Sequence, residues 1–216
     1  MIKVVSFDIG GTLLEDLNDN PNKYNLKELT KLVNIPYENV RDVYKNVFQK
    51  SNGTLSELVE KFCNDLGINN TEILNSFFVG KFSNNNVNNT ISSDKITLIK
   101  DLKENGYRVI LFSNSCCLLN NDAIKEIYDL VDGVFYSFDI GYTKDDKESY
   151  KYIENVLNVK SNEILHIGDT LKSDYIKPIE NDWNALYYGS SDDKSVNYIS
   201  SLMELYDFFD IKASIK

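Results

Sequence analysis

The N-terminal stretch Met1–Thr12 constrains the fold of this chain more than any other segment. An apolar, β-branched run from Lys3 to Phe7 stops at Asp8-Ile9-Gly10-Gly11-Thr12. A short run of this kind, closed by glycines, predicts a buried strand that enters a tight turn. The turn places one carboxylate at the carboxyl end of the strand, beside glycines that let backbone N–H groups approach a ligand closely. In open α/β sheets, ligands bind at that edge.

Further strand-like runs recur along the second half of the chain. They are Arg108–Phe112, Val134–Phe138, Glu163–Ile167 and Ala185–Tyr188. Amphipathic helical patterns precede or separate them, at Lys95–Glu104, Asn121–Leu130 and Glu148–Leu157. Strands that alternate with helices of this length indicate βαβ units. We therefore expect a Rossmann-like α/β core with a parallel sheet of about five strands.

The segment between the first and second strand-like runs has a different pattern, with helical periodicity and no convincing strand. Its helical stretches are Leu26–Leu32, Tyr37–Phe48, Ser56–Cys63 and Thr71–Phe82, with Ser56 and Thr71 as N-cap candidates. The polar string Ser83–Asn89 suits a linker back to the core. We expect an α-helical insertion over residues 16–92 and a core over residues 1–15 and 93–216. A last amphipathic helix is expected at Ile199–Phe209.

The composition narrows the partners and the compartment. The 216 residues carry 23 Lys and Arg against 33 Asp and Glu, a formal net charge of −10. That charge repels nucleic-acid backbones and anionic membranes, so we expect neither as a partner. It also repels phosphate, so a phosphate site needs local positive charge from a metal ion or a lysine. Cys63, Cys116 and Cys117 suit neither a disulfide framework nor a zinc site. The N-terminal apolar run is too short for a signal peptide, so a cytoplasmic location is expected.

Three later strand ends carry polar groups that could meet the first carboxylate. The second strand-like run leads into Ser113-Asn114-Ser115, whose hydroxyls can hydrogen-bond an anion. The loop Gly141–Lys147 carries two lysines before a predicted helix. Gly168-Asp169 follows another run and precedes Asp174, and two carboxylates at this spacing can bind a hard cation through oxygen. Each feature alone is typical of ordinary turns.

Together and in this order, these features resemble the motifs of the haloacid dehalogenase (HAD) superfamily of phosphohydrolases. The matching positions are Asp8–Thr12, Ser113, Lys144 and Gly168–Asp174. Between the first two motifs there is room for a helical cap, whereas between Ser113 and Lys144 there is not. This arrangement resembles the subclass whose α-helical cap follows the first strand.

The resemblance implies a role for each catalytic residue. Asp8 would be the nucleophile that attacks phosphorus and becomes an aspartyl-phosphate. Ser113 would hydrogen-bond the transferring phosphoryl group, and Lys144 would neutralise its oxygens and orient Asp8. Lys147 is a rival for the lysine role, but the family pattern favours Lys144 because it stands at the start of the loop.

The resemblance also implies a magnesium ion and a phosphoryl pocket. The Mg²⁺ ligands would be Asp8, the backbone carbonyl of Gly10, Asp169 and, directly or one layer behind, Asp174. The substrate's phosphoryl group would be bound by Ile9, Gly10, Ser113, Asn114 and Lys144. A carboxylate can attack a phosphoryl dianion only if that charge is offset. A divalent ion and one lysine provide the offset, and positioning does most of the remaining work.

Gly10 departs from the family pattern. An aspartate usually stands at this position, where it protonates the leaving oxygen and then deprotonates the water that hydrolyses the intermediate. The metal ligand survives, because it is a backbone carbonyl. The general acid/base is lost, and such a group typically contributes about 10²–10⁴-fold to the rate.

Four interpretations of Gly10 stay open. In the first, the protein is a phosphatase whose leaving group needs little help, or whose proton comes from Glu15 or Asp16. In the second, the chemistry differs: dehalogenation is disfavoured because Gly168-Asp169 is intact, and phosphonate hydrolysis needs a cap lysine such as Lys61 or Lys81. In the third, a phosphorylated ligand is bound without turnover. In the fourth, the N-terminal string resembles the phosphate-binding turn of sugar kinases of the actin-like ATPase class, which are much longer chains.

The remaining landmarks have structural interpretations. His166, the single histidine, lies in a predicted core strand and is expected to be buried or hydrogen-bonded. Cys116 and Cys117 are expected to pack at a helix start, and Trp183 is expected in the core. Asp145-Asp146 is expected to be a solvated turn and helix start, where negative charge is favourable.

The leading hypothesis is a Mg²⁺-dependent phosphatase that acts on a small phosphorylated metabolite, with a helical cap that closes over the substrate and excludes water. The second hypothesis is a catalytically impaired protein that binds a phosphorylated ligand. The insertion carries no motif that names a substrate, and nothing in the sequence indicates an oligomeric state.

Overall fold

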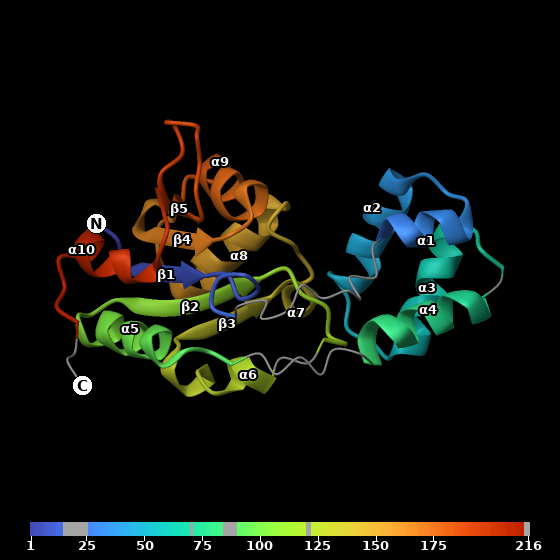
Figure 1. Cartoon of the computed structure of the whole chain (residues 1–216), viewed down its shortest axis with the longest axis horizontal. Helices are drawn as coiled ribbons and strands as arrows, with labels where there is room; N and C mark the ends of the chain where they lie inside the picture. The colour runs from blue at the N-terminus through green and yellow to red at the C-terminus, as the bar shows by residue number, and fades with distance from the viewer. Residues whose placement is uncertain (15–25, 70, 84–89, 120–121, 214–216) are drawn as a thin grey trace.

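The computed structural model describes residues 1–14, 26–69, 71–83, 90–119 and 122–213. Its centre is a six-stranded sheet in the order β3-β2-β1-β4-β5-β6, in which all neighbours are parallel (Figure 1). The strands are β1 Val4–Phe7, β2 Arg108–Ser113, β3 Gly133–Tyr136, β4 Ile164–Gly168, β5 Asn184–Tyr188 and β6 Tyr198–Ile199. The predicted fold class, α/β with a Rossmann-like parallel sheet, is confirmed. The sheet grows first to one side of β1 and then to the other, which makes the carboxyl ends of β1 and β4 a topological switch point.

The strand register brings the predicted motifs to one edge. Phe7 of β1 lies beside Leu111 of β2 and Ile167 of β4. Asp8 therefore leaves the sheet next to the ends of both neighbouring strands. The strand arrows in Figure 1 show that this edge of the sheet faces the helices α1 to α4.

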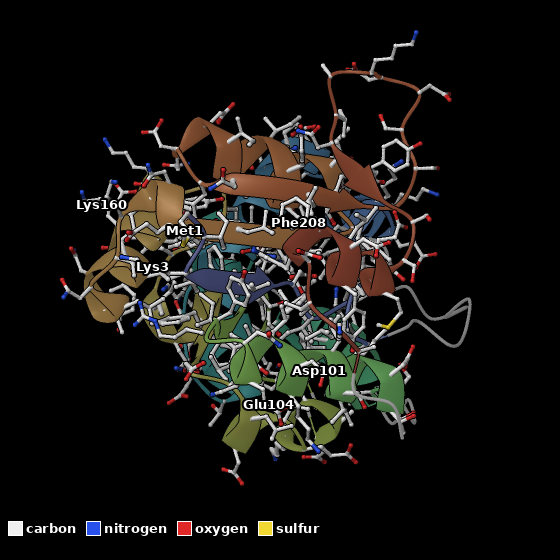
Figure 2. The ribbon with its side chains drawn as sticks, turned by 90° about the vertical axis from the view of Figure 1, so that its left-hand side faces the viewer. Met1, Lys3, Asp101, Glu104, Lys160 and Phe208 are labelled. Atoms are coloured by element: carbon white, nitrogen blue, oxygen red, sulfur yellow. The ribbon has the colours of Figure 1, made fainter. Side chains whose placement is uncertain are left out.

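Helices cover both faces of the sheet because successive strand residues point to opposite sides. Helices α5 (Ser93–Glu104) and α10 (Leu205–Phe209) pack on the face that carries Val5, Phe7, Val109, Leu111, Leu165 and Ile167. Helix α8 (Lys147–Leu157) packs on the other face, against Val4, Ile110, Phe112 and Ile164. Figure 2 looks from the end that carries Met1 and Lys3 and shows α10 beside α5. A hydrogen bond of 2.7 Å from the Tyr206 hydroxyl to Asp101 joins those two helices.

Four helices follow β1 in the chain and form a second hydrophobic cluster. These insertion helices are α1 Leu26–Val33, α2 Tyr37–Phe48, α3 Leu55–Leu66 and α4 Thr71–Ser83. Their cluster is rich in aromatic rings, and the ring centroids of Phe48 and Phe78 are 4.5 Å apart. Cys116, from the loop after β2, is buried in the same cluster.

Short elements complete the described chain. They are α6 Asp122–Lys125, α7 Ser137–Ile140, α9 Lys177–Glu180, the 3₁₀ turns η1 Tyr128–Leu130, η2 Ser161–Glu163 and η4 Leu202–Glu204, and the π-helical segment η3 Leu171–Ile176. Within the described ranges, no helix combines the length and the apolar character needed to cross a membrane.

Several predicted element boundaries were wrong. The sheet has a sixth strand, and the segment Ile199–Phe209, expected as one helix, divides into the end of β6, η4 and α10. The cause is Ser200-Ser201, whose backbone N–H groups donate to the Glu204 carboxylate and so delay the helix start. The predicted helix Asn121–Leu130 is reduced to α6 and η1 among the described residues.

Two further local predictions were wrong. The N-cap of α3 is Thr54 rather than Ser56, because Thr54 forms a capping box with Glu57. The predicted strand Val134–Phe138 ends at Tyr136, where Ser137 begins α7. Most of the predicted linker Ser83–Asn89 lies outside the described residues.

Candidate active site

Asp8 lies between two strand ends at the centre of the sheet edge. Its backbone N–H donates to the Ile167 carbonyl at 2.8 Å, and the residue is 7% exposed. The following turn is closed by backbone bonds from Leu13 and Leu14 to the Ile9 carbonyl, at 3.1 and 2.8 Å. The turn thus holds the Asp8 backbone rigidly while its carboxylate faces the site.

The two glycines of this turn have different reasons to be there. Gly11 has a φ of +76°, and a Cβ on it would lie 2.2 Å from an Asp169 carboxylate oxygen. Any other residue there would take a strained left-handed backbone and would push the Asp169 carboxylate aside. Gly10 is exposed, and a Cβ there would meet no atom within 4 Å among the described residues. Gly10 is therefore not required by packing.

Lys144 is the cation of the site. Its ammonium, on a residue only 1% exposed, donates to Asp8 at 2.5 Å and to Asp174 at 2.6 Å. Burial lowers the pKa of the Lys144 ammonium, but the charges of Asp8 and Asp174 outweigh that effect and hold its pKa above the usual value. The lysine is therefore charged at neutral pH. Lys147, its rival, is exposed at the start of α8.

Side chains of the core hold the Lys144 backbone. Its N–H donates to the Asn114 side-chain oxygen at 2.8 Å, and its carbonyl accepts from the Tyr150 hydroxyl at 2.8 Å. Asn114 was predicted as a substrate-binding residue, and in the structure its side-chain oxygen accepts the Lys144 backbone N–H. Ser113, the last residue of β2, is buried at the same edge of the sheet.

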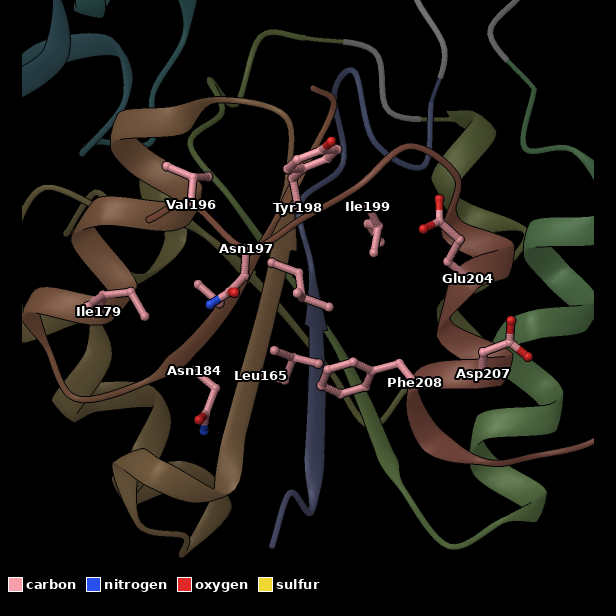
Figure 3. Close-up of a pocket in the computed structure, with 12 residues that line it drawn as sticks. Leu165, Ile179, Asn184, Val196, Asn197, Tyr198, Ile199, Glu204, Asp207 and Phe208 are labelled. Atoms are coloured by element: carbon pink, nitrogen blue, oxygen red, sulfur yellow. The ribbon is translucent and has the colours of Figure 1, made fainter. Parts of the chain in front are cut away.

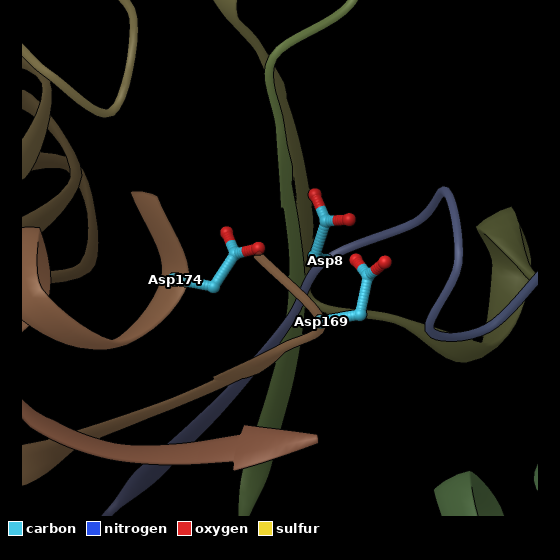
Figure 4. Close-up of side chains that lie close together, drawn as sticks. All are labelled: Asp8, Asp169 and Asp174. Carbon is cyan, nitrogen blue, oxygen red and sulfur yellow. The ribbon is translucent and has the colours of Figure 1, made fainter. Parts of the chain in front are cut away.

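Three carboxylates gather around this lysine. Asp8, Asp169 and Asp174 each offer one oxygen, and these oxygens lie within 4.8 Å of one another (Figure 4). Asp174 is brought in by η3, and a Cβ on Gly168 would lie 2.5 Å from its carboxyl carbon, so Gly168 is needed for this approach. One Asp174 oxygen accepts from the Thr170 backbone N–H at 2.9 Å, and the other accepts from Lys144.

Three carboxylates share one ammonium in this cluster, and the pKa values of these groups reflect the surplus of negative charge. Burial, together with the nearby Asp174 charge, raises the pKa of Asp8 despite the opposing Lys144 ammonium. Burial and the neighbouring Asp174 also raise the pKa of Asp169. At Asp174, burial is outweighed by Lys144 and His166, so its pKa lies below the usual value. A hard dication beside Asp8 and Asp169 would remove this surplus, and oxygen donors are the ligands Mg²⁺ prefers.

A buried polar chain extends from the site into the core. The His166 ring contacts Asp174 at 3.3 Å through Nε2 and the Ser6 hydroxyl at 2.8 Å through Nδ1. His166 is fully buried, and burial, with the nearby Lys144 charge, lowers its pKa. The imidazole is therefore neutral at neutral pH and serves as a hydrogen-bonded structural group, as predicted.

Other predicted site residues lie as follows. The Ile9 side chain is buried in the core cluster, so only its backbone can meet a phosphoryl group. Glu15 and Asp16, the candidate proton donors, lie outside the described residues. Asp145 and Asp146 lie in a turn at the start of α8, as predicted, and Asp145 is exposed. The prediction missed that each also forms an ion pair with a lysine of the insertion.

A separate hollow of about 740 Å³ lies over β4 and β5, between α9 and α10 (Figure 3). None of the three clustered carboxylates lines it. Its charged lining residues are Glu204 and Asp207, which would repel a phosphate. The hollow is therefore no alternative to the site at Asp8.

The fold and the site together define a HAD-type α/β hydrolase. A family model described as haloacid dehalogenase-like hydrolase matches residues 2–176, and the chain belongs to that family. No curated protein sequence matches the chain.

Solved structures with the same fold include enzymes of different chemistry. A HAD family enzyme, bt-2542 from Bacteroides thetaiotaomicron, in complex with magnesium and inorganic phosphate, is 17% identical with a TM-score of 0.58, over 90% of this chain and 98% of that chain. A predicted phosphoglycolate phosphatase from Haemophilus somnus 129PT is 15% identical with a TM-score of 0.63, over 96% and 98%. A 2-haloacid dehalogenase from Pseudomonas syringae pv. Tomato DC3000 is 16% identical with a TM-score of 0.60, over 97% and 99%. At sequence identities this low, the similarity shows a shared fold alone.

Proposed function

We propose that this protein is a Mg²⁺-dependent phosphatase that hydrolyses a small phosphorylated metabolite through an aspartyl-phosphate on Asp8. The observation that carries the proposal is the contact of the Lys144 ammonium with Asp8 and Asp174, with Asp169 alongside. The Asp8 carboxylate thus lies beside a fixed ammonium and beside carboxylates that can bind a divalent cation. Phosphoryl transfer needs both sources of positive charge.

The residues fit a magnesium ion. Asp8, Asp169 and the Gly10 backbone carbonyl would hold it, and it would supply the positive charge that offsets a phosphoryl group. Both Asp174 oxygens already accept hydrogen bonds. That favours Asp174 as the residue that orients Lys144, one layer behind the ion.

The chain's own residues would carry out two displacements at phosphorus. In the first, an Asp8 oxygen forms a bond to phosphorus while the bond to the leaving oxygen breaks, and the leaving oxygen takes a proton from solvent. Lys144 and Ser113 hold the phosphoryl oxygens as charge moves onto the leaving group. In the second, water attacks the phosphorus of the aspartyl-phosphate and gives up a proton to solvent. The bond from the Asp8 oxygen to phosphorus breaks, which releases inorganic phosphate and restores the Asp8 carboxylate.

We further propose that residues 16–92 form a cap over this site and that residues 1–15 and 93–216 form the catalytic core. The insertion helices have their own hydrophobic cluster, distinct from the clusters on the two faces of the sheet. A separately packed unit beside the carboxyl edge of the sheet can close over a substrate and exclude water.

The test is phosphate release from a panel of phosphate esters, with and without Mg²⁺. We expect turnover that needs Mg²⁺ and is abolished in Asp8→Asn, because an amide is a poor nucleophile. Asp42→Asn, an exposed change on α2, is the matched control and should keep the wild-type rate. Absence of turnover, together with tight binding of a phosphate mimic, would favour the impaired phosphate-binding protein.

Phosphonate hydrolysis is a second candidate, favoured by the environment of Lys81. The Lys81 ammonium lies 4.6 Å from the centre of the Tyr44 ring, and burial lowers its pKa. A lowered pKa makes an amine more nucleophilic toward a carbonyl group at neutral pH. Lys61, the other candidate, is exposed, and its one hydrogen bond to a described residue is to Ser51 at 3.3 Å. Borohydride trapping of a phosphono-aldehyde on the wild type, lost in Lys81→Met, would support this chemistry.

A further inference from the structure

Two lysines of the insertion reach across to the loop that carries Lys144. Lys45, on α2, donates to Asp145 at 2.8 Å. Lys50, just after α2, contacts both oxygens of Asp146, at 2.9 and 2.8 Å. The four side chains are between 21% and 31% exposed, so these ion pairs are partly shielded from water. Their partners are about 100 residues away in the chain, so each pair joins the insertion to the core.

Asp146 has a second set of contacts, within its own loop. The same carboxylate accepts hydrogen bonds from the Thr143 backbone N–H at 2.8 Å and from the Thr143 hydroxyl at 2.7 Å. These bonds close the turn whose second residue is Lys144. One carboxylate therefore both shapes the turn that carries the catalytic lysine and binds the ammonium of Lys50.

The loop after β2 is held by the same helices. Cys116 is buried in the hydrophobic cluster of the insertion, and the Cys117 thiol contacts the Gly53 carbonyl at 3.5 Å. Asn114, two residues before Cys116, accepts the Lys144 backbone N–H. Both sides of the Lys144 backbone are thus connected to the insertion helices, one by charge and one by apolar packing.

We propose that Lys45 and Lys50 are positioning residues, which brace the turn Thr143–Asp146 when the insertion docks and so hold the Lys144 ammonium against Asp8. The Lys144 ammonium is then held against Asp8 only while the insertion is docked on the core. The catalytic part of this inference rests on the proposed phosphatase function, whereas the bracing of the turn does not. An ionic brace also weakens with salt, because the screening length falls from about 10 Å at 0.1 M to about 3 Å at 1 M.

The size of the effect follows from the partial exposure of these pairs. A fully exposed ion pair changes an equilibrium constant by up to about fivefold, and the partial shielding of these pairs strengthens them further. Loss of the Lys50 pair should therefore change the measured rates by about threefold to tenfold. That is far smaller than the loss expected when a catalytic group is removed.

The experiment compares Lys50→Met and Lys45→Met with two controls. Lys50→Arg keeps the charge and the reach to both carboxylate oxygens. Arg41→Gln removes one positive charge from α2, where Arg41 pairs only within that helix, with Glu38 and Asp42, among the described contacts. Each variant is assayed for amide hydrogen exchange over residues 141–147 without substrate, and for kcat and KM with a phosphate ester.

We expect the two Met variants to exchange the Thr143 and Lys144 amides about threefold to tenfold faster and to lose a similar factor in kcat, with KM little changed. Lys50→Arg and Arg41→Gln should behave as the wild type, and 1 M salt should bring the wild type toward Lys50→Met. Equal exchange in Lys50→Met and Arg41→Gln would overturn the inference. Faster exchange in a protein without phosphatase activity would support the brace and refute only the proposed function.

Discussion

Replacing Gly10 by aspartate restores the acid group that a phosphatase of this type would use on the leaving oxygen. The structure leaves room for it: a Cβ on Gly10 meets no described atom within 4 Å, and the backbone there is outside the left-handed region. Gly11, next to it, has neither property. We therefore expect Gly10→Asp to fold with a melting temperature close to that of the wild type.

The gain should depend on the leaving group. A positioned general acid contributes about 10²–10⁴-fold, which corresponds to about 2.7–5.5 kcal/mol of barrier. It acts by protonating the leaving oxygen, so a strongly basic alkoxide benefits most and a nitrophenolate hardly at all. We expect kcat/KM of Gly10→Asp to rise about 100-fold or more with alkyl phosphates, and less than about tenfold with 4-nitrophenyl phosphate.

The assay is kcat/KM across a series of phosphate esters with leaving groups of graded basicity. This ratio reports the first displacement, in which the leaving group departs, so slow hydrolysis of the intermediate does not enter. Gly10→Asn is the matched control, because it has the same size and no acidic proton. A folded Gly10→Asp variant that is no faster than Gly10→Asn with alkyl phosphates would refute the reasoning, and would indicate that another group already supplies the proton.

Three other predictions concern stability, metal and pH. Gly11→Ala should destabilise the protein in urea unfolding by more than Gly141→Ala. The latter has a similar φ of +78° but no described atom within 4 Å of a Cβ, and should cost about 1 kcal/mol. Equal losses would mean that the Asp169 carboxylate moves aside freely. Activity should disappear with a chelator and return with Mg²⁺. Asp169→Asn should raise the Mg²⁺ concentration needed for half-maximal rate by at least about tenfold. An unchanged Mg²⁺ titration would show that Asp169 is not a metal ligand. Burial raises the pKa of Asp146, but its lysine and threonine partners outweigh burial and hold that pKa below the usual 3.8. The ionised Asp146 carboxylate therefore stabilises the fold above pH 3.8, and this stabilisation is lost as the pH falls through the lowered pKa. The difference in unfolding free energy between wild type and Asp146→Asn should therefore shrink below about pH 4, and a difference that does not change with pH would contradict this.

Local signals in the sequence were enough for the core strands and for the convergence of the motifs. An apolar run closed by glycines, as at Val4–Phe7, reports its own strand, and parallel strands bring their carboxyl ends to one edge whatever the details of packing. Asp8, Lys144 and Asp174 could therefore be expected together before any distance was known. The capping box of Thr54 and Glu57 was also readable, as a threonine followed three residues later by glutamate, and was missed.

Other features had no local signal. The pairing of Lys45 with Asp145 and of Lys50 with Asp146 joins residues about 100 positions apart. A charge in a polar loop looks the same in the sequence whether it is solvated or paired. The family pattern favoured Lys144 over Lys147, but the residues of the loop give no physical reason for that choice. The reason is the turn closed by Asp146, which directs the Lys144 ammonium into the site.

The sequence by itself determined the α/β class, the run of helices between the first two strands and the residue types gathered at the carboxyl edge, because periodicity and glycine placement act over a few neighbouring residues. Only the tertiary structure decided which lysine meets Asp8, that Gly10 stands in open space while Gly11 does not, and that the insertion braces the loop of Lys144. These outcomes depend on contacts between distant segments, whose energies arise only once the sheet has set the segments side by side.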